Sequence, residues 1–256
     1  MGGGASSRAF SQDLKDIEII KLMVICSEDV YKLEQILTKE QLTLEKYEKE
    51  SNDTNNNLQY GYYKILQGTY AGQTILSFRG LDSLRGTKQL IDFGSGGDYI
   101  RQCINEAVEI AKLLTPNWVC GHTIGGVYAE CISSALGISG AAFNTLGPWS
   151  PYVNYNILPD LKHQDAKFVV FNTYADPICH LWGDRHIVNS VIWTKHMGEE
   201  ISEESNRIFG EMKEKLDSSS PPEYVHEVMH SPDGKKLEYL SNIESMRLYI
   251  LSLTEI

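Results

Sequence analysis

The stretch that most constrains the fold is Asn117 to Gly126, which reads NWVCGHTIGG. An apolar run, Trp118 to Cys120, leads into a glycine-containing turn, and a helix-patterned run follows. This order predicts a strand, a sharp turn and a helix. It is typical of a nucleophile elbow, G-x-S-x-G, in which glycines on both sides of the central residue let the two backbones approach closely. Thr123 holds the central place, where the pattern has serine. We therefore expect an α/β fold built around this turn.

The length and composition fit one such domain. The chain has 256 residues, of which 42% are hydrophobic, enough for a sizeable core. We expect a mobile tail over residues 1–12 and a single domain over residues 13–256. The formal net charge of −11 argues against a nucleic-acid partner, because such binding relies on Lys and Arg that displace counterions from phosphates.

The cysteines and the lengths of the apolar runs indicate in which cellular compartment the protein is located. The five cysteines are well spread and lie mostly in apolar runs, which predicts buried free thiols in a reducing environment. No segment reaches the roughly 18 consecutive apolar residues that a membrane-spanning helix needs. The N-terminus has no apolar core of a signal peptide. We expect a cytoplasmic protein.

Hydrophobic periodicity predicts the other elements. The segment from Asp13 to Leu37 is expected to form two helices with a break at Ser27 to Asp29, and the charged run Lys39 to Glu50 is expected to extend the second helix. Tyr60 to Leu66 and Thr74 to Phe78 predict a hairpin. The remaining predicted elements are an amphipathic helix at Asp98 to Leu114, strands at Ala141 to Phe143 and Lys167 to Phe171, and helices at Glu199 to Leu216 and Tyr239 to Leu253.

The elbow resembles that of the class 3 (fungal-type) lipases, which usually reads GHSLGG. Three further segments resemble the family in the same order: TILSFRGLDSL (Thr74 to Leu84), SGAAFNTLGP (Ser139 to Pro148) and FVVFNTYADP (Phe168 to Pro177). The resemblance implies the α/β-hydrolase fold, with a mostly parallel central sheet and helices on both faces. It also implies places for a nucleophile, an acid, a histidine base and oxyanion donors.

Several of those places hold unusual residues. Thr123 keeps a hydroxyl group, but a β-branched residue is disfavoured in the positive-φ turn of an elbow. Asp176, just before Pro177, matches the family's acid. The family's oxyanion donors correspond to the backbone N–H groups of Leu81 and Ile124, and Leu81 replaces a Thr or Ser whose hydroxyl group also contributes.

The base is harder to locate. The family's catalytic histidine opens the last helix, and the best local match places Ser241 there. His226 or His230 could supply the base instead. These two histidines also read H-E-x-x-H, a spacing that binds zinc when it lies on a helix. Because Pro222 and Pro232 confine the run to about two turns and no third ligand is evident, we expect no metal and no cofactor.

The other histidines have ordinary interpretations. His122 is structural in the family that the chain resembles. Surface or capping roles are expected for His163, His180, His186 and His196. The glycine-rich run Gly94 to Asp98 is expected to be a loop and not a phosphate cradle.

The N-terminus carries a modification pattern. Met1 to Ser6 matches M-G-x-x-x-[ST], which predicts N-myristoylation of Gly2. The alternative is a flexible leader. A single acyl chain gives only marginal, reversible membrane binding, so we expect at most weak peripheral association.

Together the departures predict loss of activity. In a serine protease, losing the catalytic Ser or His alone lowers turnover about a millionfold. We expect a catalytically inactive lipase-like protein (a pseudoenzyme) that acts as a binding or structural component of a larger cytosolic assembly. It would contact protein partners through the helix Glu199 to Leu216 or the aromatic segment Trp149 to Tyr155. Two alternatives stay open: a slow ester or lipid hydrolase that uses Thr123 with Asp176, and a non-catalytic lipid-binding protein.

Overall fold

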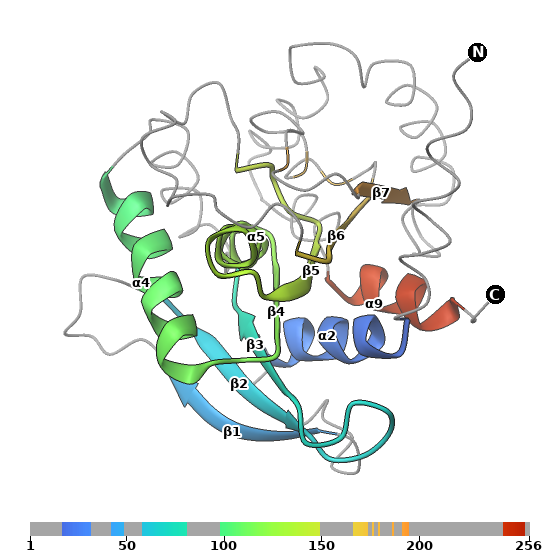
Figure 1. The fold of residues 1–256 in the computed structure, drawn as a ribbon. Coiled ribbons are helices and arrows are strands. Elements are labelled where there is room, and N and C mark those ends of the chain that lie inside the picture. Colours follow the sequence, from blue (N-terminus) through green and yellow to red (C-terminus); the bar gives the residue numbers. More distant parts are fainter. Residues whose placement is uncertain are drawn as a thin grey trace.

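The strands of the chain form one mostly parallel sheet (Figure 1). The computed structural model describes residues 17–31, 42–48, 58–80, 98–148, 166–173, 176, 179, 186, 191–194 and 243–253. The strands of these residues make a seven-stranded sheet whose spatial order follows the sequence. They are β1 (Leu42–Glu48), β2 (Tyr60–Ile65), β3 (Thr74–Phe78), β4 (Trp118–His122), β5 (Ser139–Phe143), β6 (Phe168–Thr173) and β7 (Val191–Thr194). The first three strands pair antiparallel, and β3 to β7 pair parallel.

Helices cover both faces of this sheet, as predicted. One face packs against α2 (Ile17–Asp29) and α9 (Ile243–Ser252), and the other packs against α4 (Asp98–Leu114) and α5 (Ile124–Leu136). The alternation of side chains along a strand divides the core accordingly. In β6, Phe168 and Val170 join the cluster under α4 and α5, whereas Val169 and Phe171 join the cluster under α2 and α9.

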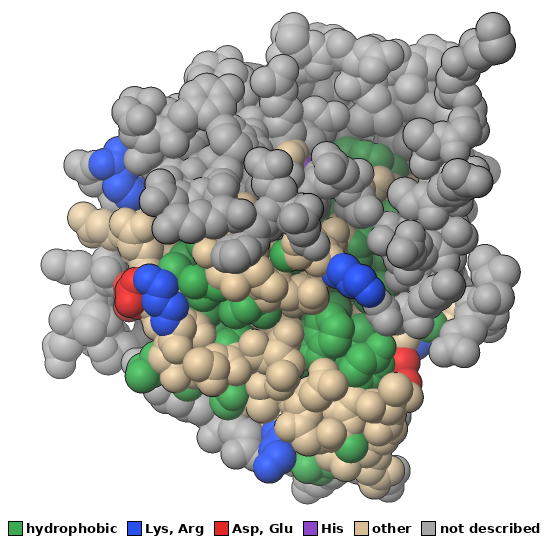
Figure 2. All heavy atoms as spheres, in the orientation of Figure 1, with side chains coloured by type: hydrophobic (Ala, Val, Ile, Leu, Met, Phe, Trp, Pro, Cys, Tyr) green, Lys and Arg blue, Asp and Glu red, His purple; other side chains and the backbone are tan. Residues whose placement is uncertain are grey.

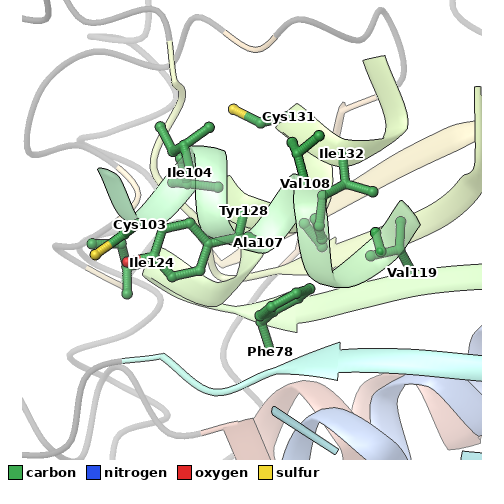
Figure 3. Close-up of a cluster of buried hydrophobic side chains, with 14 of the residues drawn as sticks. Phe78, Cys103, Ile104, Ala107, Val108, Val119, Ile124, Tyr128, Cys131 and Ile132 are labelled. Carbon is green, nitrogen blue, oxygen red and sulfur yellow. The ribbon is translucent and has the colours of Figure 1, made fainter. Parts of the chain in front are cut away.

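The cluster under α4 and α5 is the larger apolar core (Figure 3). Phe78 from β3 lies beneath Tyr128 of α5, with their ring centroids 6.0 Å apart in an edge-to-face arrangement. Ile104 and Val108 of α4 come from the neighbouring helix and are buried in the same cluster. The elbow helix α5 therefore packs against both α4 and the sheet.

Most of the predicted elements are confirmed. The hairpin β2–β3 and the helix α4 lie where the pattern placed them. The helix α2 runs through to Asp29, so the predicted break at Ser27 to Asp29 is wrong: these residues form the last turn of the helix. The helix α5 stops at Gly137, whose left-handed φ of 74° is favourable only for glycine and whose N–H donates to the carbonyl group of Ser133. The helix α9 starts at Ile243.

The prediction for the charged run is also wrong. The charged run Lys39 to Glu50 was expected to extend a helix, but its residues 42–48 form β1, which pairs antiparallel with β2 and carries a register shift between Leu44 and Lys46. Leu42 is buried under α2, opposite Ile65. The open edge of β2 offers backbone hydrogen bonds that the charge pattern of the run does not reveal. The strand β7 was not predicted.

Other predicted features are outside the described residues. These are the helix Glu199 to Leu216, the aromatic segment Trp149 to Tyr155 and the glycine-rich run before Asp98. All five cysteines are buried and free, as expected. Within the described ranges no helix is long and apolar enough to cross a membrane. On the face drawn in Figure 2, the charged side chains of the described residues are scattered and do not form a patch of one sign.

Candidate active site

The elbow has the predicted geometry. The strand β4 ends at His122, α5 begins at Ile124, and Thr123 between them has φ 53° and ψ −121°. Two backbone hydrogen bonds hold the turn, from Thr123 N to Phe143 O at 3.1 Å and from Gly126 N to Thr123 O at 3.0 Å. A β-branched residue in this region costs on the order of 1–3 kcal/mol. The surrounding structure therefore imposes the conformation.

Two glycines explain why the strand and the helix can lie so close. A Cβ atom on Gly121 would meet the carbonyl oxygen of Gly125, and a Cβ atom on Gly125 would meet the carbonyl oxygen of Phe78, each closer than 3.0 Å. Real Cβ atoms essentially never make such contacts. The glycine spacing of the elbow is thus required by the backbone packing of β3, β4 and α5.

The side chain of Thr123 is turned toward the end of β3. The residue is only 4% exposed. A Cβ atom on Gly80 would collide with Thr123 Oγ1, with the carbonyl oxygen of His122 and with the hydroxyl oxygen of Tyr31. The two hydroxyl groups therefore both lie against the Cα atom of Gly80.

Tyr31 joins the site from the chain segment after α2. Its hydroxyl oxygen accepts a hydrogen bond from Gly80 N at 2.8 Å and lies 3.0 Å from His122 Nδ1. Its ring packs edge-on against the imidazole ring, with centroids 5.6 Å apart. The guanidinium group of Arg79 lies 5.1 Å from the centroid of the Tyr31 ring. His122 thus has a contact consistent with the structural role that the family resemblance implied.

A buried hydrogen-bond network supports the elbow from the opposite side. Thr145 Oγ1 donates to the carbonyl oxygen of Thr123 at 2.7 Å. Asn172 in β6 clamps the backbone of Thr145, because its Oδ1 accepts from Thr145 N at 3.0 Å and its Nδ2 donates to Thr145 O at 3.2 Å. The ends of β5 and β6 are therefore tied to the strained turn.

The network ends in a buried hydrogen-bonded pair, Glu130 and His186, that the sequence did not reveal. His186 Nδ1 lies 2.9 Å from Glu130 Oε2, and the two side chains are 1% and 0% exposed. Asn172 Nδ2 lies 3.4 Å from His186 Nε2. Because Asn172 Nδ2 can only donate, His186 Nε2 accepts, and Nδ1 carries the proton that is donated to Glu130. The expected surface or capping role of His186 is therefore wrong.

Asp176 lies beyond β6, at the same edge of the sheet as Thr123. It is fully buried, its N–H donates to Thr173 O at 3.0 Å, and its carbonyl oxygen accepts from Cys179 N at 3.3 Å. Burial raises the pKa of the Cys179 thiol, and the nearby Asp176 carboxylate raises it further. The strands β4 and β6 are parallel, with β5 between them, so Thr123 and Asp176 both follow carboxyl ends, where ligand sites of such sheets gather.

Of the remaining predicted site residues, only Ile124 is among the described residues. Ile124 is the first residue of α5 and is buried. Leu81, His226, His230, Ser241 and Gly2 are outside the described residues. Among the residues that the structure describes, no group of three or more His, Cys, Asp or Glu could hold a metal ion.

Comparisons with known proteins give a likeness in fold and none in sequence. No family model matches the sequence. No curated protein matches it either. The fold is similar to that of the crystal structure of M37 lipase, with a TM-score of 0.50 over 92% of this chain and 93% of that chain. The fold is lipase-like. At 9% identity the likeness extends to the fold alone.

Proposed function

We propose that this chain is a catalytically inactive protein of lipase-like fold that acts as a binding or structural component of a larger assembly. The observation that most supports this proposal is the burial of the Thr123 side chain. Its backbone keeps the elbow conformation, but its side chain is buried and Oγ1 packs against Gly80 beside the Tyr31 hydroxyl group. A nucleophile needs an oxygen atom that the substrate can approach.

Two further observations support this proposal. Both histidines that the structure describes engage other partners, since His122 contacts Tyr31 and His186 contacts Glu130. In the sequence, Leu81 and Ser241 stand where the resembled family has a hydroxyl-bearing oxyanion residue and the catalytic histidine. We also propose that the protein binds protein partners, is located in the cytoplasm and is myristoylated at Gly2.

A second candidate is a slow ester hydrolase that uses Thr123. The observation in its favour is the retained strain, because strained residues cluster at functional sites. Asp176, which the family resemblance implies as the acid, is buried. This candidate needs His226 or His230 to act as the base.

Hydrolysis of a short-chain p-nitrophenyl ester separates the two candidates. We expect the natural protein, Thr123→Ala and Thr123→Ser to release p-nitrophenol no faster than buffer with an equal amount of inert protein. Turnover by the natural protein that Thr123→Ala abolishes would establish the slow hydrolase. A large gain in Thr123→Ser alone would reveal a usable base and contradict the loss of proton-transfer groups.

A further inference from the structure

We propose that Tyr31 is a built-in cap on the elbow, so that the N-terminal helix α2 controls access to Thr123. This inference rests on the proposed function and deepens it, since it states how the elbow of a lipase-like fold is closed. The cap comes from a residue 92 positions before Thr123.

The position of Tyr31 is set by the end of α2. Val30 N donates to Cys26 O and Tyr31 N donates to Glu28 O, both at 3.1 Å, so the turn after the helix is fixed. The helix is itself anchored on the sheet, because the hydroxyl group of Tyr63 donates to Asp29 Oδ2 at 3.0 Å. Tyr31 is therefore presented to the elbow by a well-packed element.

The hydroxyl group of Tyr31 ties two backbone segments together. Gly80 N can only donate, so the phenol oxygen accepts that hydrogen bond, and the same hydroxyl group is also hydrogen-bonded to His122 Nδ1. Gly80 is at the end of β3, and His122 directly precedes Thr123. One side chain thus sets the spacing between the end of β3 and the elbow.

The ring of Tyr31 also has specific contacts. The guanidinium group of Arg79 lies over it, and Arg79 Nη1 donates to Gln59 Oε1 at 2.7 Å. A cation over an aromatic face contributes about 0.5–2 kcal/mol. His122 packs edge-on against the ring. An atom placed beside Thr123 Oγ1 at the position of a Gly80 Cβ would also collide with the Tyr31 hydroxyl oxygen.

Thiol alkylation tests the cap without relying on turnover. A thiol introduced by Thr123→Cys reports access to the elbow, and iodoacetamide labelling is followed by peptide mass spectrometry. The native cysteines give a low background because they are buried, and burial raises the pKa of the Cys120 thiol to about 11. The protein without Thr123→Cys serves as the blank.

We expect Tyr31→Ala to speed alkylation of the introduced thiol at least about tenfold, because local opening controls such reactions. The matched control is Tyr62→Ala, which truncates a half-buried tyrosine whose hydroxyl group donates to Leu114 O away from the elbow. It should leave the rate nearly unchanged. Equal rates with and without Tyr31→Ala would overturn the cap.

Tyr31→Phe gives a milder variant that keeps the ring. We expect faster hydrogen exchange at the Gly80 amide, with the amides of Ile75 and Ser77 inside β3 unchanged. Unchanged exchange at Gly80 would overturn the hydrogen-bonding part of the proposal. Ester turnover by the natural protein would instead contradict the proposed function, whatever the alkylation rates.

Discussion

At the scale of single residues, the elbow shows which features a sequence reveals. The turn at Thr123 was predictable because two glycines at fixed spacing are needed for the close approach of β4 and α5. Tyr31 and His186 were not predictable as site residues. Their partners are 91 and 56 positions away in the chain, and only the fold brings them together. The sequence around Glu130 did not indicate that this carboxylate is buried within α5 either.

The pair Glu130–His186 makes a prediction at this scale. Removing one partner of a buried hydrogen bond typically costs about 1–3 kcal/mol, since the other partner is left unsatisfied. We therefore expect Glu130→Ala to lower the free energy of unfolding in urea by about that amount. Glu130→Gln keeps an acceptor for His186 Nδ1 and should cost less.

The control for this prediction is a surface pair on α4. Glu109 and Lys112 are 2.7 Å apart with side chains 69% and 52% exposed, so Glu109→Ala should hardly change the unfolding free energy. A loss in Glu130→Ala no larger than that in Glu109→Ala would show that the buried pair does not stabilise the elbow region.

At the scale of elements, pattern and fold agree where one face of an element is buried. The helix α4 was predicted with its observed bounds because its apolar residues form one stripe. The strand β1 was misread because a run rich in Lys and Glu has no such stripe, and the edge of β2 decides its conformation. The strand β7 is only four residues long, too short for a periodic signal.

The packing of α9 on α2 gives a prediction at this scale. Ile250 is fully buried in the cluster that α9 shares with α2, whereas its neighbour Leu251 is 38% exposed. We expect Ile250→Ala to lower the unfolding free energy by about 2–5 kcal/mol, through lost burial and a residual cavity. Leu251→Ala should change it by less than about 0.5 kcal/mol. Similar losses in both variants would mean that α9 is not held by this face.

At the scale of the whole molecule, the two apolar layers follow from the alternation in the parallel strands. The resemblance to lipases therefore predicted the architecture, and the likeness to a solved lipase supports it. The function is harder to predict because it depends on a few side chains at one edge of the sheet. The same fold can carry a catalytically active or an inactive nucleophile elbow.

Buried thiols make the stability of the whole molecule sensitive to alkali. Burial raises the pKa of Cys120 from 9.0 to about 11 and raises the pKa of Cys26, Cys131 and Cys179 as well. The unfolded chain releases these protons first, so stability is intact below pH 9 and falls as the pH rises toward 11.

Urea unfolding under reducing conditions measures this effect. Cys120 alone should account for about 2 kcal/mol of the loss between pH 7 and pH 10.5. Cys120→Ala should reduce the pH-dependent loss by that amount, whatever its effect at pH 7. An equal loss in both proteins would contradict the assignment.

The most direct measurement of the central claim is ester turnover by the unmodified chain, compared with Thr123→Ala at equal concentration. The account predicts that both give the background rate of p-nitrophenol release, because Thr123 is buried against Gly80 beside the Tyr31 hydroxyl group. Turnover above background that disappears in Thr123→Ala would contradict it.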